Sequence, residues 1–129
     1  MTPLVLTSFT AVNALGRGTA AVLEALTAAR TGLKPCTFEK VSLETWVGEV
    51  VGLDDLRVCE RLAEFDCRNN RLAELALEQD GFAARIARAR AKYGPHRIAV
   101  ILGTSTSGIL ETEHAYQQRD PQTGALPAS

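Results

Sequence analysis

The sequence predicts an α/β fold of one domain, built on an incomplete, mostly parallel sheet with flanking helices. Two apolar runs predict the sheet, because Pro3–Thr7 and Arg97–Leu102 are almost continuously apolar, as in strands covered on both faces. Segments of helical period between these runs predict the flanking helices. With 129 residues, of which 46% are hydrophobic, the chain is long enough to bury one core.

Charge and composition exclude several classes of protein. The chain has 14 Lys and Arg against 15 Asp and Glu, and its net charge of -1 gives no basic field for nucleic acid or an anionic membrane. No apolar run approaches the roughly 18 residues of a membrane span, and the N-terminus lacks a basic region followed by an apolar stretch. We therefore expect a cytoplasmic protein that binds neither nucleic acid nor membranes.

The cysteines and histidines do not form a metal-binding pattern. Cys36, Cys59 and Cys67 contain no C-x-x-C pair. His96 and His114 are too distant in the sequence to complete a zinc spacing with them. We expect three reduced thiols, no metal site and no cofactor.

A helix is expected after the first strand. Thr19 has the residue type of an N-cap for a helix over Ala20–Arg30. Gly32 is expected to end this helix in a left-handed conformation, and Pro35 prevents the helix from resuming. The residues expected on its core-facing stripe are Val22, Leu23, Leu26 and Ala29.

Residues 41–50 are less regular than the segments on either side. Their alternation and their β-branched residues predict a hairpin or an edge strand. Trp46 is the only tryptophan of the chain, and we expect it in the core.

Two helices are expected in the middle of the chain. Asp66 is placed to cap a helix over Cys67–Gln79, which Asp80-Gly81 would end. Its inward residues are expected to be Leu72, Leu75 and Ala76. A second helix, Phe82–Lys92, carries four basic residues, which form either a solvated face or a contact for an acidic partner.

The last third of the chain holds the strongest strand. Arg97–Leu102 leads into the glycine- and hydroxyl-rich turn Gly103–Gly108 and then into a helix expected over Ile109–Gln118. The composition of residues 119–129 predicts a connecting tail, and residues 1–118 are expected to form the domain. The two apolar strands need neighbours on both sides that this chain does not supply, so the sheet is expected to be incomplete.

The turn Gly103–Gly108 does not match a nucleotide-binding motif. A P-loop requires Lys and then Ser or Thr after its second glycine, where this chain has Ile109 and Leu110. The first strand ends in Ser8-Phe9-Thr10 instead of the glycines of a dinucleotide fingerprint. A turn of this kind still aims backbone N–H groups at one point, which suits an anion or a carbonyl oxygen.

No catalytic set is evident among the reactive side chains. None of the cysteines follows a buried strand, and neither histidine completes a Ser/His/Asp or Cys/His arrangement. We therefore expect no catalytic residue within these 129 residues.

Four segments of the chain, in this order, resemble one family. Val5–Gly16 and Leu26–Leu33 are similar to the family's opening strand, turn and helix and to its small-Arg-Ser-Gly-Ile signature. Trp46–Val50 is similar to the edge segment that follows, and Arg97–Gly108 resembles its central strand and glycine-rich turn. The family is that of the β-ketoacyl-acyl-carrier-protein synthases, condensing enzymes of the thiolase-like fold. The resemblance covers nearly the whole chain and implies the N-terminal part of this fold.

Departures from the family pattern point to one subfamily. Ser8, Thr10 and Ala29 stand where the family has glycines. Together with Cys36–Glu39 and the hydroxyl-rich Thr104–Ser107, they resemble the synthases encoded with aryl-polyene pigment pathways.

The resemblance implies an acyltransferase that this chain does not complete. Such enzymes load an acyl chain onto a cysteine, decarboxylate malonyl-carrier protein and join the two with the help of two histidines. In the family all three residues come after the part that this sequence matches, and none of its cysteines or histidines occupies their positions. We therefore expect a segment that is inactive alone. The full-length enzyme would be a homodimer or heterodimer that binds acyl carrier protein.

One site is carried over from the resemblance. Thr106 occupies the position that lines the acyl pocket in the family, where the size of the residue limits chain length. Gly103 and Gly108 bound the same turn. The alternative is that Thr106 only satisfies backbone groups of the turn.

A second function, of another class, also remains open. The chain would then be a non-enzymatic module that binds an acyl carrier protein or a full-length synthase. In this hypothesis the basic helix Phe82–Lys92 meets the acidic carrier protein, and binding weakens steeply with salt.

Overall fold

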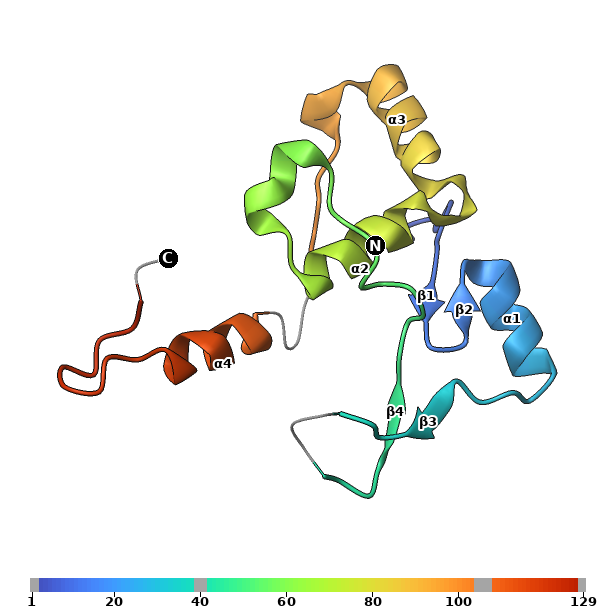
Figure 1. The fold of residues 1–129 in the computed structure, drawn as a ribbon. Coiled ribbons are helices and arrows are strands. Elements are labelled where there is room, and N and C mark those ends of the chain that lie inside the picture. The colour runs from blue at the N-terminus through green and yellow to red at the C-terminus, as the bar shows by residue number, and fades with distance from the viewer. Residues whose placement is uncertain (1–2, 39–41, 104–107, 128–129) are drawn as a thin grey trace. The chain divides into compact units, whose positions relative to one another are not determined.

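A computed structural model describes residues 3–38, 42–103 and 108–127 (Figure 1). The chain divides into two compact units, residues 1–98 and 99–129. The described part combines helices with two antiparallel sheets of two strands each. The α/β class is thus confirmed in its broad sense, while the expected mostly parallel sheet is wrong.

The larger unit begins with a tight hairpin. β1 (Val12–Asn13) pairs antiparallel with β2 (Gly16–Arg17). The Asn13 side chain accepts a hydrogen bond from the backbone N–H of Leu15 at 2.8 Å, which is the local turn that asparagine favours. This hairpin leads directly into α1 (Thr19–Thr27).

The start of α1 differs from the sequence-based prediction. Gly18, with φ of 86°, is the N-cap, and Thr19 already lies inside the helix. The Asp80 carboxylate accepts a hydrogen bond from the backbone N–H of Thr19, which is one of the first N–H groups of α1 that have no acceptor within the helix. The predicted Thr19 cap is therefore wrong, because a residue distant in the sequence supplies the oxygen.

The core-facing side of α1 also differs from the prediction. Ala25 is 1% exposed, whereas Leu23 and Leu26 are 65% and 61% exposed. The buried residue of α1 is therefore the small Ala25, and both leucines are exposed in the described part of the chain.

The end of α1 comes earlier than predicted. Ala29 takes the left-handed φ of 51°, which was expected at Gly32. Gly32 is needed for a different reason, because a Cβ added to it would lie 2.4 Å from the Ala14 carbonyl oxygen. Close approach of the backbone, and not a helix stop, requires glycine at this position.

The second sheet confirms a hairpin in the expected region. β3 (Leu33–Pro35) pairs antiparallel with β4 (Trp46–Gly48), with Pro35 opposite Trp46. β4 has one neighbour in this sheet, as expected of an edge strand. Trp46 is 63% exposed, so its predicted burial is wrong.

The helices of the middle region agree with the prediction to within one or two residues. After η1 (Glu60–Phe65), α2 spans Arg68–Glu78 and α3 spans Phe82–Tyr93. Between α2 and α3, η2 (Gln79–Gly81) contains the predicted Asp-Gly stop, in which Asp80 and Gly81 have φ values of 56° and 66°. η3 (Pro95–Arg97) follows α3.

The core of the larger unit is small. In α2, Leu75 is buried while Leu72 and Ala76 are half-buried, which confirms the predicted inward face of this helix. The buried hydrophobic residues among those described are Ala25, Leu53, Val58 and Leu75.

The two predicted parallel strands do not form. Residues 3–7 and 98–102 have no regular secondary structure, and η3 takes the place of the predicted start at Arg97. Strands need the hydrogen bonds of a neighbouring strand, and the sheets of the described part contain neither run. Ile98 is half-buried, and the other large apolar residues of the two runs are each at least 78% exposed, namely Leu4, Val5, Leu6, Val100, Ile101 and Leu102.

The smaller unit contains the last helix, α4 (Ile109–Gln117), as predicted from the sequence. A turn follows it, in which the Asp120 carboxylate accepts hydrogen bonds from the backbone N–H groups of Gln122 and Thr123 at 2.8 and 2.7 Å. These hydrogen bonds lower the pKa of Asp120 below its ordinary value.

Candidate functional site

The turn expected to form an acyl site belongs to the smaller unit. Gly103 lies in an irregular, exposed segment, and a Cβ added to it would meet no atom within 4 Å. Gly108 is the N-cap of α4, with a left-handed φ of 79° that favours glycine. Thr106 lies outside the described residues, so its assignment to an acyl pocket stays a prediction.

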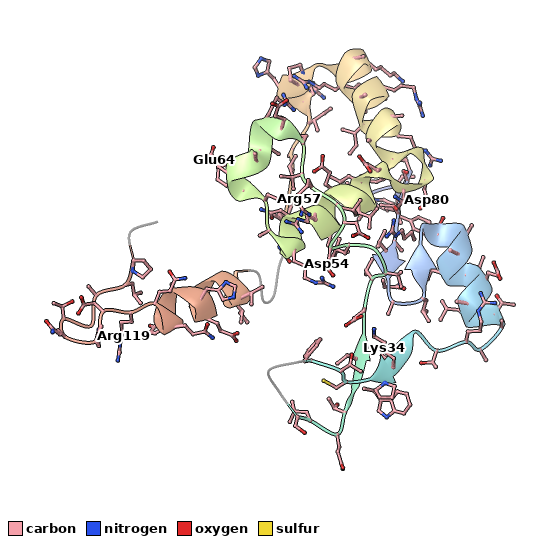
Figure 2. All side chains as sticks on the ribbon, viewed as in Figure 1. Lys34, Asp54, Arg57, Glu64, Asp80 and Arg119 are labelled. Atoms are coloured by element: carbon pink, nitrogen blue, oxygen red, sulfur yellow. The ribbon has the colours of Figure 1, made fainter. Side chains whose placement is uncertain are left out.

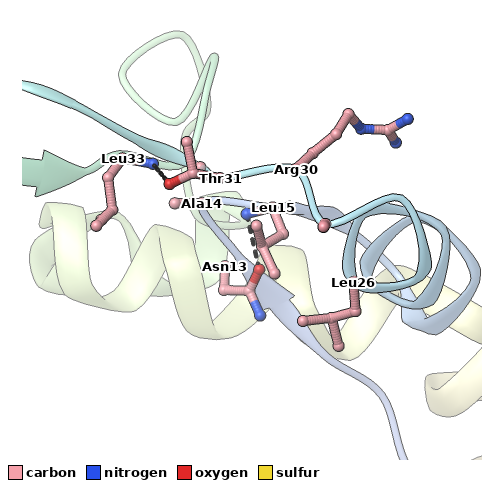
Figure 3. Close-up of a pocket in the computed structure, with 9 residues that line it drawn as sticks. Asn13, Ala14, Leu15, Leu26, Arg30, Thr31 and Leu33 are labelled. Carbon is pink, nitrogen blue, oxygen red and sulfur yellow. Dashed lines mark hydrogen bonds between the residues drawn. The ribbon is translucent and has the colours of Figure 1, made fainter.

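The larger unit has an apolar groove between the β1–β2 hairpin, the end of α1 and the start of β3 (Figure 3). The volume of this groove is about 520 Å³. Its lining residues are Asn13, Ala14, Leu15, Leu26, Ala29, Arg30, Thr31, Gly32 and Leu33. Apolar side chains dominate this surface, which therefore suits an apolar group of a ligand.

The polar atoms around the groove are already engaged. The Thr31 hydroxyl accepts a hydrogen bond from the Leu33 backbone N–H at 3.1 Å (Figure 3). The Arg30 guanidinium forms an ion pair with Glu24 at 3.0 Å. The lining contains no Cys, His, Asp or Glu, so the Thr31 hydroxyl has no base beside it in the groove that could activate it for covalent chemistry.

A second site surrounds Asp80, which Figure 2 labels at the junction of α2 and α3. Its carboxylate accepts hydrogen bonds from the hydroxyl groups of Thr10 at 2.9 Å and Thr19 at 3.0 Å. It also accepts the Thr19 backbone N–H at 2.9 Å. We call Asp80 and its neighbours Ser8, Thr10, Thr19 and Arg85 the Asp80 cluster. It joins the N-terminal segment, α1 and the α2–α3 turn.

The electrostatics of the Asp80 cluster favour the carboxylate form. The hydrogen bond from the Thr19 backbone N–H lowers the pKa of Asp80, and the Thr10 and Thr19 hydroxyls and the nearby positive charge of Arg85 act in the same direction. A negative charge at the first turn of α1 also complements the helix dipole. Asp80 therefore acts as an internal anion at a helix N-terminus.

A hollow of about 310 Å³ borders the Asp80 cluster. There the Arg85 guanidinium donates a hydrogen bond to the Ser8 hydroxyl at 3.0 Å. The Asp80 carboxylate lines the same hollow. This carboxylate already accepts hydrogen bonds from the Thr10 hydroxyl and the Thr19 backbone N–H. Ser8 thus has no base among its hydrogen-bond partners, and the cluster holds the fold together without the groups of a nucleophilic site.

The third polar cluster is built around Asp66. Its carboxylate accepts two hydrogen bonds from Arg71, each of 2.7 Å, and Arg57 lies 3.7 Å away. The hydrogen bonds from Arg71, the backbone N–H of Val58 and both positive charges lower the pKa of Asp66 to about 2. Asp66 was predicted to cap α2, but the N-cap is Cys67, and Asp66 holds Arg71 instead.

The cysteines do not form a reactive centre in the described part of the chain. All three thiols are free and half-exposed. Cys59 lines a hollow of about 300 Å³ with Arg71 and Glu74, where the Cys59 backbone N–H donates to the Glu74 carboxylate at 3.1 Å. Within residues 3–38, 42–103 and 108–127, no group of three or more His, Cys, Asp or Glu residues is placed to hold a metal ion.

Comparisons with protein-family models, with curated proteins and with solved structures give no match for this chain. None of the helices in the described ranges combines the length and the apolar character that a transmembrane segment needs.

Sequence reasoning identified the elements around Asp80 but not the role of this residue. Asp-Gly after an amphipathic segment signals a helix stop, and the structure confirms this signal. Nothing in the local pattern indicates that the carboxylate will bind Thr10 and Thr19, which lie 70 and 61 residues away. The sequence offered no signal for a distant acceptor, because Thr19 appeared to supply the capping oxygen itself, and the N-cap position of Gly18 is seen only in the structure.

Proposed function

We propose that this chain is the N-terminal part of a β-ketoacyl-acyl-carrier-protein synthase of the thiolase-like fold, from fatty acid or aryl-polyene biosynthesis. The complete enzyme would catalyse decarboxylative Claisen condensation of an acyl and a malonyl thioester. Four segments of the sequence support the proposal through their resemblance to the family, namely residues 5–16, 26–33, 46–50 and 97–108.

The observation that carries the proposal is that two apolar runs, residues 3–7 and 98–102, are not paired in a sheet of the described chain. Both have the composition of central strands and lie outside the two sheets of the described chain, and all their large apolar residues except the half-buried Ile98 are exposed. Exposure of continuous apolar runs is unfavourable for an isolated domain, and an interaction surface accounts for it. A synthase sheet completed by further strands would cover both runs.

The proposed chemistry assigns no covalent step to this chain. In the complete enzyme, loss of CO₂ from the malonyl thioester gives a carbanion that attacks the acyl-cysteine carbonyl. The new C–C bond forms as the C–S bond to the cysteine breaks. The cysteine and both histidines would lie outside these 129 residues, and the turn with Gly103, Thr106 and Gly108 would contribute to the acyl pocket. Removal of the nucleophile leaves only binding, so the chain alone would be inactive.

The coding sequence tests this proposal. Sequencing the gene beyond the codon for Ser129 is expected to reveal a strand that ends in a cysteine, followed by two histidines. The chain itself, mixed with acyl- and malonyl-carrier protein, is expected to release no CO₂ above the buffer rate. Turnover by the chain alone would overturn the assignment, and so would a coding region without the cysteine-bearing strand in it or in a neighbouring gene.

A second candidate function is a non-enzymatic module that binds an acyl carrier protein or a full-length synthase. The observation that favours it is the set of exposed basic side chains on α3, namely Arg85, Arg88, Arg90 and Lys92. Such a module would form a salt-sensitive complex with carrier protein. It would not catalyse condensation when a complete synthase is absent.

A further inference from the structure

We propose that the outer edge of β4 binds an extended segment of a partner protein, which adds a third strand to the β3–β4 sheet. β3 is the one neighbour of β4 in this sheet (Figure 1). Addition of a strand to a free sheet edge is a recurring mode of peptide recognition, in which backbone hydrogen bonds give the affinity. This proposal is independent of the proposed function.

The hydrogen bonds of the sheet determine which backbone groups of β4 point outwards. The Cys36 backbone N–H donates to the Thr45 carbonyl at 2.8 Å, directly before β4 begins. Hydrogen-bonded and non-hydrogen-bonded pairs alternate along an antiparallel ladder, so Val47 bonds to β3, while the N–H and C=O groups of Trp46 and Gly48 face away from it. Outside the ladder, no backbone group in the described ranges bonds to these four groups.

The outer edge of β3 is closed to such a strand. Pro35 has no backbone N–H, and the backbone N–H of Leu33 already donates to the Thr31 hydroxyl at 3.1 Å. Within the described part of the chain, the two residues of β3 that face outwards therefore have no free donor. Proline on an edge strand is one device that prevents edge pairing, and β4 contains no proline. The sheet is thus protected at one edge and open at the other.

The open edge belongs to a sheet that is anchored in the larger unit. A Cβ added to Gly48 would lie 2.9 Å from the Cβ of Ala14, so the turn of the β1–β2 hairpin packs on this sheet. Lys34 of β3 and Glu49, which follows β4, form an ion pair. A partner segment would therefore meet a preformed edge, which lowers the entropic cost of binding.

The side chains beside the edge define the chemistry of the segment. Trp46 is exposed and lies on the same face of the sheet as Gly48. Cross-strand neighbours on one face contact each other, so an apolar, β-branched side chain of the partner would cover the indole. Glu44 is exposed and belongs to none of the ion pairs of the described residues, and a basic residue at the end of the segment would complement its charge.

The test is a titration of the full chain with a defined extended peptide. The probe is Lys-Val-Thr-Val-Thr-Val-Lys with blocked ends, and its counterpart carries N-methyl groups on the three central residues, which can then no longer donate. Trp46 is the only tryptophan of the chain, so its fluorescence reports on the edge of β4. The probe is expected to shift this emission in a saturable manner, and the N-methylated counterpart is expected to leave it unchanged.

NMR spectra recorded during the titration test the assigned direction of the backbone groups. The amide proton resonances of Trp46 and Gly48 are expected to move downfield, because their N–H groups gain acceptors. The resonance of Val47 is expected to move less, since its N–H already bonds to β3.

Two variants separate the backbone donor of Trp46 from its indole. Trp46→Thr removes the indole, whereas Trp46→Pro removes both the indole and the outward N–H. Anisotropy of a fluorescein-labelled probe is expected to show binding to Trp46→Pro that is at least fivefold weaker than binding to Trp46→Thr. An outward-facing proline is tolerated on an edge strand, and circular dichroism checks the fold of both variants. If Trp46→Pro does not fold, the comparison of the two peptides on the unmodified chain decides.

A charge swap tests the basic end of the segment. A probe with Glu in place of Lys is expected to bind the unmodified chain at least threefold more weakly than the Lys probe. Glu44→Gln is expected to reduce this difference. Glu64→Gln makes the same change in net charge at an exposed site outside the sheet, and it is expected to preserve the difference.

Three outcomes would overturn the proposal. Equal binding of the probe and its N-methylated counterpart would mean that no backbone pairing takes place. Equal affinity of Trp46→Pro and Trp46→Thr for the probe would mean that the edge of β4 is not the site. Self-association of the chain alone, abolished by Trp46→Pro, would make a second copy the occupant in place of a partner protein. None of these results bears on the synthase proposal, which the coding sequence decides separately.

Discussion

The Asp80 carboxylate caps α1 from 61 residues away, by accepting the backbone N–H of Thr19 at 2.9 Å. Gly18 stands at the N-cap position and has no side chain that could accept a hydrogen bond from the first turn of α1. The same carboxylate binds the Thr10 hydroxyl, so one side chain fixes three segments that are distant in the sequence. This long-range contact holds the N-terminal segment and α1 to the α2–α3 turn.

Removing the Asp80 carboxylate is therefore expected to loosen α1. In Asp80→Ala, amide exchange at Thr19 should accelerate about tenfold, because the N–H loses its acceptor. The control is Asp120→Ala, which removes a carboxylate that binds two backbone N–H groups in the smaller unit. Exchange measured by NMR should be unchanged at Thr19 in the control. Equal exchange in wild type and Asp80→Ala would show that the cap has no role in the stability of α1.

The Asp66–Arg71 pair predicts a loss of stability in acid. The pKa of Asp66 is lowered to about 2 in the folded chain by its hydrogen bonds with Arg71, and it is near 3.8 when unfolded. Below about pH 4 the unfolded state takes up the proton first, so the free energy of unfolding falls as the pH is lowered towards 2. Urea unfolding between pH 5 and pH 2 measures this slope.

Two variants isolate the contribution of Asp66 to that slope. Asp66→Asn should be less stable at pH 6 and should flatten the pH dependence below pH 4, because the titrating group is gone. Asp55→Asn alters an exposed carboxylate with no ion pair in the described part of the chain and should leave the slope in place. An unchanged slope in Asp66→Asn would contradict the assigned role of the pair.

Leu75 is expected to be the most sensitive position of α2. It is 5% exposed in a core with few other buried residues. Leu75→Ala should lower the free energy of unfolding by about 2–5 kcal/mol, or prevent folding, because it removes packed atoms and leaves a cavity. Leu77→Ala, at a 47% exposed position of the same helix, should cost less than about 1 kcal/mol. Similar losses in the two variants, measured in urea, would contradict the observed burial.

Gly32 is expected to tolerate no side chain. A Cβ at this position would lie 2.4 Å from the Ala14 carbonyl oxygen, and backbone cannot rotate away as a side chain can. Gly32→Ala should destabilise the larger unit by about 1–3 kcal/mol. Gly103→Ala is the matched control, because a Cβ at Gly103 meets no atom within 4 Å. Equal unfolding midpoints for the two variants would argue against the close contact between the β1–β2 hairpin and Gly32.

Local elements could be predicted from the sequence because their causes are local. The extents of α2 and α3 and the stop at Asp80-Gly81 follow from periodicity and turn chemistry, and the structure confirms them. Leu75 was placed correctly because α2 is strongly amphipathic.

The remaining features depend on contacts between distant segments. The apolar runs at residues 3–7 and 98–102 predicted strands, but a strand forms only with a neighbour, and the sheets of the described chain lack both runs. Trp46 was placed in the core by its type, yet it lies on a two-stranded sheet with too little structure around it to bury an indole. The role of Asp80 likewise required the tertiary fold.

Amide hydrogen exchange of the two apolar runs tests the central claim most directly. At a concentration where the chain is monomeric, the amides of Val5, Leu6 and residues 100–102 are expected to exchange within tenfold of the rate of an unstructured peptide, because no partner strand protects them. The buried α2 amide of Leu75 serves as the protected reference. Exchange of both runs at the slow rate of Leu75, in a confirmed monomer, would mean that the chain pairs its own strands, and the proposal of an incomplete synthase sheet would then be wrong.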